Sequence, residues 1–243
     1  MIEAGSLEYA HARLSARFGN RADEAAWRRI ETIRDIGPML DAVRASPLAA
    51  WVARFPADDG PHAVERAMRA HLRERATAIA AWMPPAWRAA TAWCAMLVDL
   101  PLLQHLARGG AAPRWLDDEE PAHRDALFAF LAVAGVEADP DRLGRAWREA
   151  WQRQLPERIG ASGLLAEFLR VIDAHFAAFA DPGLVDGWAQ RRRLQACLAR
   201  MFRRATLDPS VAFIFLALSA LDFERLRGEI LRRIAFPRLP LAA

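Results

Sequence analysis

The sequence contains no lysine, a single tyrosine and two cysteines, and valine, isoleucine and threonine together supply fewer than one residue in ten. Alanine, in contrast, supplies about one residue in five. β-Branched and aromatic residues favour strands, whereas alanine has the highest helix propensity. The scarcity of strand-forming residues therefore excludes a sizeable sheet, and the abundance of alanine predicts an all-α fold.

Because lysine is absent, arginine carries all of the basic charge. The 33 arginines face 30 acidic residues, which gives a formal net charge of +3 and a pI of about 9.6. The charge is uneven, since residues 184–243 contain eleven arginines and five acidic residues. This asymmetry indicates an acidic partner, nucleic acid or a lipid headgroup layer, or simply a solvated arginine-rich surface. No recognised nucleic-acid module accompanies the arginine clusters, so we do not expect nucleic acid as the partner.

The cysteines and the apolar runs bear on where the protein works. Cys94 and Cys197 are flanked by apolar residues in helical patterns, which favours small core residues over a disulfide or a ligand pair. Residues 1–5 show neither the basic nor the apolar region of a signal peptide. The longest apolar run, 211–221, covers about half of a bilayer span. We therefore expect a cytoplasmic protein without a transmembrane segment, peripheral on the cytoplasmic face of a membrane at most.

The length of 243 residues suits one large domain or two small ones. Residues 109–120 are the most linker-like stretch, because two glycines at 109–110 and Pro113 precede four consecutive acidic residues at 117–120. We predict an N-terminal helical unit at 1–110, an acidic linker at 111–121 and a C-terminal helical unit at 122–243. The sequence leaves open whether the two units have separate cores or pack as one domain.

The two halves of the sequence contain a short similar motif. Asp99 opens the sequence DLPLL, and Asp222, 123 residues later, opens the sequence DFERL. An Arg-Gly pair follows each of them, at 108–109 and at 227–228. Each half also shows a long amphipathic helix, a break containing proline or glycine, and a second long helix. These features predict a helical array built from about two similar antiparallel-helix units.

Apolar residues recur with helical periodicity along most of the chain. Asp23 is a suitable N-cap residue, Gly19 and Asn20 follow the first helix, and Pro101 favours a kink or a break in a long one. We expect helices over 7–18, 23–35, 64–83, 87–106, 122–136 and 210–235.

No catalytic motif stands out in the sequence. Residues 160–163 lack the spacing of a nucleophile elbow, and a phosphate-binding loop would need a lysine. Glu120 and His123 have the spacing of di-iron ligands, but the second pair that such a site requires is missing. His71 and Glu74 share the charged face of one helix, which favours a solvated pair over an acid–base couple. We therefore predict no catalytic, cofactor-binding or metal-binding residues.

Asp99 and Asp222 are the most informative carboxylates, because each interrupts an apolar helix. A buried carboxylate needs a partner. We expect each of them either to form a salt bridge or to reach solvent along the face of its helix.

The surroundings of these two aspartates resemble the C subunit of V-type and archaeal A-type ATPases, which is called subunit d in eukaryotes. Residues 99–109 are similar to the Asp-x-x-Asn-Leu-Lys stretch of that family and to the Arg-Gly-like turn after it. Residues 211–230 resemble its closing helix, where an apolar run leads into Lys-x-x-Glu-x-x-Asn-Leu-Arg. Leu226 and Arg227 match the last two positions of that pattern.

Two segments of the N-terminal half extend the resemblance. The sequence YAHAR from Tyr9 to Arg13 is similar to the family's N-terminal Tyr-x-x-Ala-Arg helix, and residues 64–72 resemble its first long helix. The chain is identified as a short, divergent member, since it has room for two helical units where the family stacks three. The departures are Pro101-Leu102 in place of Asn, Ser219 in place of Lys, Asp222 in place of Glu and Arg225 in place of Asn.

The resemblance implies mechanical work and no catalysis. Members of the family are funnel-shaped helical adaptors that sit on the cytoplasmic mouth of the membrane rotor ring and hold the central shaft. They transmit torque between ATP hydrolysis and proton transport, so the implied partners are the rotor-ring and central-shaft subunits. The matching positions, which we expect to organise the helical units, are Tyr9, Arg13, Asp99, Asp222 and Arg227.

Three other functions fit the same composition. The first is a helical protein–protein adaptor unrelated to an ATPase. The second is a helical enzyme or ligand-binding bundle, which would show a closed pocket with convergent polar groups and a strongly perturbed titrating residue. The third is an arginine-driven binder of nucleic acid or of an anionic surface, whose binding would weaken with salt.

Overall fold

The computed structural model describes residues 5–55, 61–134, 142–156, 163–181, 183 and 186–236. In these residues the chain forms α-helices and two short 3-10 helices and no strand, which confirms the predicted all-α fold. The elements in chain order are α1 (Leu7–Gly19), α2 (Glu24–Thr32), α3 (Ile36–Arg44), α4 (Ala49–Val52), α5 (Pro61–Trp82), α6 (Pro85–Trp93), η1 (Cys94–Asp99), α7 (Leu100–Ala107), η2 (Arg114–Asp118), α8 (Pro121–Ala134), α9 (Arg142–Gln152), α10 (Gly163–Phe179), α11 (Gly187–Arg204) and α12 (Ser210–Ala235).

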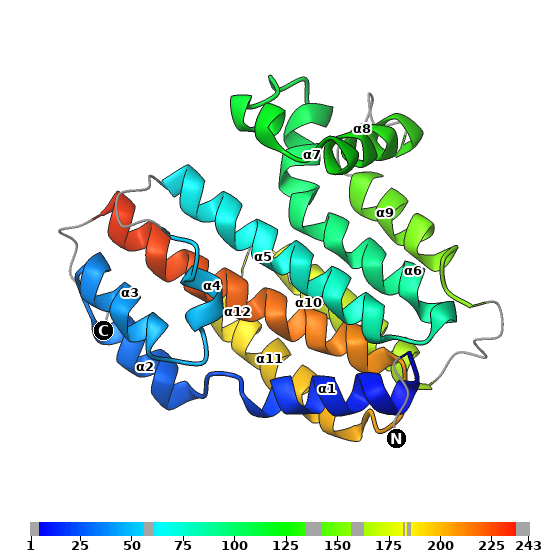
Figure 1. The fold of residues 1–243 in the computed structure, drawn as a ribbon, viewed down its shortest axis with the longest axis horizontal. Helices are drawn as coiled ribbons and strands as arrows, with labels where there is room; N and C mark the ends of the chain where they lie inside the picture. Colours follow the sequence, from blue (N-terminus) through cyan, green and yellow to red (C-terminus); the bar gives the residue numbers. More distant parts are fainter. Residues whose placement is uncertain are drawn as a thin grey trace.

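Helices α5 and α12 are the longest in the described part of the chain, and they run antiparallel through the middle of the molecule (Figure 1). The start of α5 packs against the end of α12, so that Val64 lies in one apolar cluster with Leu226 and Ile230. The end of α5 packs against the start of α12, so that Ile79 shares another cluster with Val211. Most of the other helices pack on this pair.

Buried apolar side chains form three clusters. The first lies between α1, the end of α5 and the first half of α12, and helices α6, α9, α10 and α11 cover it. The second lies between α2, α3, α4, the start of α5 and the second half of α12. The third joins α7, α8 and α9 to the 3-10 helices. The first two clusters take residues from both 1–110 and 122–243, so these segments share apolar packing. Their relation as two copies of one unit stays a prediction.

The apolar run at 211–221 lies in the first half of α12. Most of its side chains are buried in the first cluster, against α1, α5, α10 and α11. The run is therefore part of the protein core. Among the helices that the structure describes, none combines the length and the apolar character needed to cross a bilayer.

Several helix boundaries follow the sequence signals closely. The helix expected over 210–235 is α12, and Asp23 caps α2 by accepting a hydrogen bond from the Ala26 N–H at 2.8 Å. The helix expected over 87–106 is broken, but upstream of Pro101: α6 ends, η1 follows, and α7 begins one residue before the proline. Proline lacks an N–H donor and is tolerated in the first turn of a helix, and Pro101 lies in the first turn of α7.

Helices α7 and α8 project from the α5–α12 pair and form one end of the molecule (Figure 1). The acidic stretch before α8 folds in part into η2, and its Leu116 is buried in the third cluster. This stretch is therefore packed against the projecting end.

Candidate functional site

Asp222 lies in the middle of α12 and is only 4% exposed. Its carboxylate accepts two hydrogen bonds from Arg21 in the α1–α2 connection, from Nε at 2.9 Å and from Nη2 at 2.8 Å. Burial raises the pKa of the Asp222 carboxyl above its usual value, and the hydrogen bonds from Arg21 oppose that rise. The expected salt bridge is present, and it ties the connection after α1 to the last helix.

Asp99 ends η1 and is 1% exposed. Nη1 of Arg73 on α5 donates to both of its carboxylate oxygens, at 3.0 and 3.3 Å. Nη2 of the same arginine donates to Glu119 at 3.0 Å, and Nε2 of His123 lies 3.2 Å from Asp99 Oδ2. The Asp99 group therefore connects α5 to the projecting α7–α8 end, and it places His123 against a carboxylate.

Tyr9, Arg13 and Arg227 also make contacts between or within helices. Arg13 Nη1 donates to the Tyr9 hydroxyl at 2.7 Å, and its guanidinium lies 4.7 Å from the ring centre of Trp82 on α5. Nη2 of Arg227 on α12 donates to Glu65 on α5 at 3.2 Å. These contacts join α1 and α12 to opposite ends of α5.

The predicted positions do not converge on one point. Tyr9 and Arg13 touch each other, while the other three belong to separate ion-pair groups. Helix α5 nevertheless supplies a charged neighbour to each of those three. The neighbouring pairs are Arg73 with Asp99, Glu65 with Arg227 and Arg75 with Asp222.

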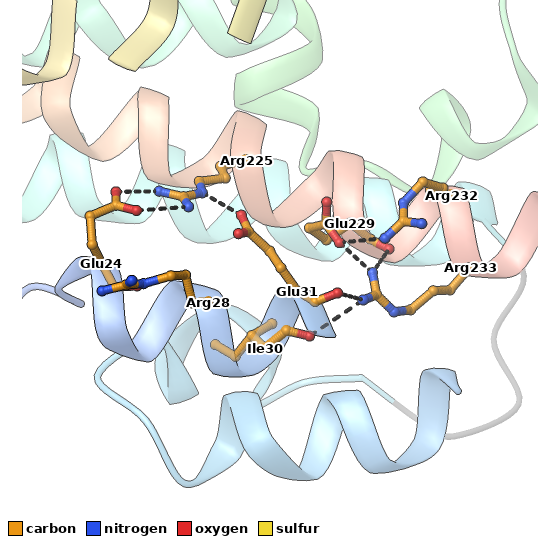
Figure 2. A network of polar contacts seen from close by, with 8 residues as sticks. All are labelled: Glu24, Arg28, Ile30, Glu31, Arg225, Glu229, Arg232 and Arg233. Carbon is orange, nitrogen blue, oxygen red and sulfur yellow. Dashed lines mark hydrogen bonds and ion pairs between the residues drawn. The ribbon is translucent and has the colours of Figure 1, made fainter. Parts of the chain in front are cut away.

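A network between α2 and α12, shown in Figure 2, was not anticipated from the sequence. Arg225 on α12 donates from Nε to Glu31 at 2.7 Å and from Nη1 and Nη2 to the two oxygens of Glu24 at 2.7 and 3.2 Å. Its guanidinium lies 4.5 Å from the ring centre of Trp27. Burial opposes the charge of Arg225, but the hydrogen bonds to the two glutamates outweigh that effect and raise the pKa of the guanidinium.

Arg233 forms the second half of this network (Figure 2). Its side chain is nearly fully buried, and it donates to the backbone carbonyls of Ile30, Glu31 and Ile33 at the end of α2. The carboxylate of Glu229 on the preceding turn of α12 balances its charge. A cation against the last carbonyls of a helix satisfies acceptors that the helix itself cannot satisfy.

A basic group lies where α5 faces the middle of α12. The guanidinium of Arg75 is 4.6 Å from the ring centre of Trp51, and its Nη2 is 3.3 Å from His71 Nε2. Nη1 donates to the Ser219 hydroxyl at 3.4 Å. Burial, followed by the charge of Arg17, lowers the pKa of Arg75 to about 10. Arg75 is the charged member of this group, so the group carries a net positive charge.

His71 and Glu74 do not form the solvated pair that the sequence suggested. His71 is half-buried, with its ring edge-on to Trp51 at a centroid distance of 4.8 Å. Glu74 instead accepts a hydrogen bond from Arg54 at 2.6 Å. Burial and the charge of Arg75 lower the pKa of His71 to about 4, so the imidazole is neutral near pH 7 and its Nε2 can accept from Arg75.

This lowered pKa predicts a pH effect on stability. Between about pH 6.5 and pH 4 the unfolded chain binds a proton at His71 that the folded protein rejects, so stability is lost as the pH falls. After allowance for partial solvent screening, we expect the wild type to lose about 1–2 kcal/mol more than His71→Gln between pH 7 and pH 4.5. Urea unfolding of both proteins at the two pH values measures this difference. Parallel losses in the two proteins would contradict it.

Asp99 and Asp222 are each bound by an arginine from another segment, and these ion pairs connect helices. In the part of the chain that the structure describes, no three His, Cys, Asp or Glu side chains are grouped to hold a metal ion. Cys94 and Cys197 are free thiols, and burial raises the pKa of Cys94 to about 12, which leaves its thiol unreactive near pH 7.

Comparison with known proteins gave no match to a protein-family model, to a curated protein or to a solved structure. The functional argument therefore rests on the geometry of the described residues and on the resemblance of the short motifs around the two buried aspartates.

Proposed function

We propose that this protein is a non-catalytic helical adaptor of the V-type and A-type ATPase kind, which couples the central shaft to the membrane rotor ring. One observation carries the proposal. The two aspartates of the resembling motifs, Asp99 and Asp222, are buried and bound by Arg73 and Arg21 from other segments. Residues that hold helices together in this way suit a part that transmits force.

The projecting α7–α8 end supports a protein partner. Leu127 and Phe130 of α8 are buried in the third cluster, whereas Phe128 and Val133 of the same helix are 44% and 80% exposed. Leu97 of η1 is also exposed. Large exposed apolar side chains on an element that projects from the rest of the molecule are typical of surfaces that a partner covers. In the proposed function the surface of α8 receives a subunit of the rotor assembly.

Affinity purification tests the proposal. Tagged protein is recovered together with gently solubilised membranes of its own organism, and the co-purifying proteins are identified by mass spectrometry. We expect rotor-ring and central-shaft subunits of an ATPase. Recovery of soluble proteins instead would reject the ATPase role in favour of an unrelated adaptor, and recovery of no partner would reject both.

A matched pair of variants makes this experiment specific. Phe128→Ser combined with Val133→Ser removes the two exposed large apolar side chains of α8 and should reduce partner recovery about tenfold. Leu207→Ser removes an exposed apolar side chain between α11 and α12, far along the chain from α8, and should leave recovery unchanged. Equal recovery with both variants would show that α8 is not the contact.

A further inference from the structure

The solvent-facing side of α11 is dominated by arginine. The helix contains no acidic residue, and its apolar residues Leu194, Leu198 and Met201 are buried in the first cluster. Its exposed residues are a tryptophan, an alanine and five arginines: Trp188, Ala196, Arg192, Arg193, Arg200, Arg203 and Arg204. Like charges on one helix repel each other, so this side of α11 is costly unless opposite charges balance it.

The protein itself balances this charge only in part. Arg204 pairs with Glu167 of α10 at 2.9 Å, and Arg192 lies 3.5 Å from Asp186, the N-cap residue of its own helix. In the described part of the chain no carboxylate lies within ion-pair distance of the other three exposed arginines, which are Arg193, Arg200 and Arg203. The exposed side of α11 therefore carries an excess of positive charge that an acidic partner would complement.

The spacing of two of these arginines matches the repeat of a second helix. Arg193 and Arg200 are seven residues apart, so they lie on the same side of α11, about 10.5 Å apart along its axis. The exposed Ala196 lies between them, and its small side chain lets a partner come close to the helix. An α-helix packed alongside has the same repeat, so carboxylates seven residues apart on it would meet both arginines.

Trp188 adds an apolar contact at the start of the same helix, one turn before Arg192. Its side chain is 41% exposed. The guanidinium of Arg191 lies 5.0 Å from its ring centre, and a Cβ atom at Gly228 of α12 would lie 3.3 Å from its Cζ2. The ring is therefore held between α11 and α12 while part of it faces solvent. Tryptophan and arginine are the residues that most often dominate the energy of protein–protein contacts.

We propose that the exposed side of α11 binds an acidic α-helix of a partner protein, whose carboxylates pair with Arg193, Arg200 and Arg203 and which also contacts Trp188. Duplex nucleic acid fits less well, because α11 packs against both α10 and α12 and does not project as a helix in the major groove must. A lipid surface also fits less well, since the apolar residues of α11 other than Trp188 face the protein core. This inference depends neither on the ATPase role nor on the surface of α8.

A designed peptide tests the proposal. The probe is a labelled helical peptide of about 20 residues in which glutamates recur every seven residues, and a scrambled peptide of the same composition is its blank. Fluorescence anisotropy at low salt measures binding. We expect the repeat peptide to bind at least tenfold more tightly than the scrambled one, and binding to weaken as salt is added. Equal binding of the two peptides, or no binding of either, would overturn the proposal.

Charge reversal shows whether the peptide contacts these arginines. Arg193→Glu combined with Arg200→Glu should lower the affinity for the glutamate peptide about tenfold or more. The same double variant should bind a peptide with lysine in place of each glutamate, which the wild type should not bind. Because neither arginine has a partner in the described part of the chain, the variant should keep the helical circular dichroism spectrum of the wild type.

The matched control reverses two arginines on another helix. Arg142 and Arg145 are exposed on α9 and have no carboxylate partner among the described residues. Arg142→Glu combined with Arg145→Glu changes the net charge by the same amount and should keep the wild-type affinity. Equal losses in the two double variants would mean that the peptide responds only to net charge, and this result would overturn the proposal.

Two further probes test the other anionic partners. These are a DNA duplex of about 20 base pairs and vesicles that contain phosphatidylserine. We expect neither to bind as tightly as the glutamate peptide at the same salt concentration. Tighter binding of the duplex or the vesicles, lost in Arg193→Glu combined with Arg200→Glu, would overturn the acidic helix and assign the exposed side of α11 to phosphate groups.

Discussion

Replacing Asp222 with alanine should lower the free energy of unfolding by about 3–5 kcal/mol, the cost of leaving a buried ion-pair partner without its counter-charge. The side chain of Arg21 is only 12% exposed, and Asp222 accepts hydrogen bonds from both its Nε and its Nη2. Arg75 would also lose its favourable charge interaction with this carboxylate. Urea unfolding followed by circular dichroism at pH 7 measures the change.

Two controls make this prediction specific to the buried pair. Asp41→Ala removes a carboxylate from an exposed pair with Arg44 and should cost less than about 1 kcal/mol. Combining Asp222→Leu with Arg21→Met removes both charges and should recover most of the loss, because no unpaired charge remains. A cost below about 1 kcal/mol for Asp222→Ala would show that the pair does not hold α12 to the α1–α2 connection.

Local sequence signals predicted a helix well where its apolar pattern was separate from that of the next element. Helix α12 begins right after Pro209, follows an uninterrupted helical pattern and was predicted over the same residues, 210–235. The segment 87–106 was harder, because its apolar pattern continues through η1 while the hydrogen-bonding pattern of the backbone changes. Periodicity reports which residues are apolar, and it does not report whether a turn is α-helical or 3-10.

The candidate site was predicted in part. The sequence marked Asp99 and Asp222 as carboxylates in need of a partner, because apolar residues surround both of them. It could not identify the partners, since Arg21 is 201 residues from Asp222 and one of 33 arginines. His71 was misjudged for a related reason. Its helix face is charged in the sequence, and only the packing of α4 against α5 shows that Trp51 covers it.

The way α2 is attached shows what the buried Arg233 and the partly buried Arg225 do at a helix contact. This helix has nine residues, which is too short to be stable in water by itself. Trp27 and Ile30 are its buried apolar side chains, and Arg225 and Arg233 of α12 bind its acidic side chains and its last carbonyls. Long arginine side chains let α12 hold a short neighbouring helix by both its charged face and its C-terminal end.

Arg233→Met tests this attachment. We expect a loss of about 3–5 kcal/mol in the free energy of unfolding, because three carbonyls at the end of α2 lose their donor and each unsatisfied buried acceptor costs about 1–3 kcal/mol. Hydrogen exchange should reveal where the loss begins: amides of α2 should exchange earlier than those of α10, which Arg233 does not touch.

The neighbouring arginine provides the control. Arg232 binds the same Glu229 at 2.9 Å, but it is more exposed and reaches no carbonyl of α2 in the structure. Arg232→Met should therefore cost less than about 1 kcal/mol and leave the exchange of α2 amides unchanged. Equal effects of the two variants would mean that the shared carboxylate matters and the helix end does not. A loss confined to Arg233→Met would establish that one side chain of α12 closes the C-terminus of α2.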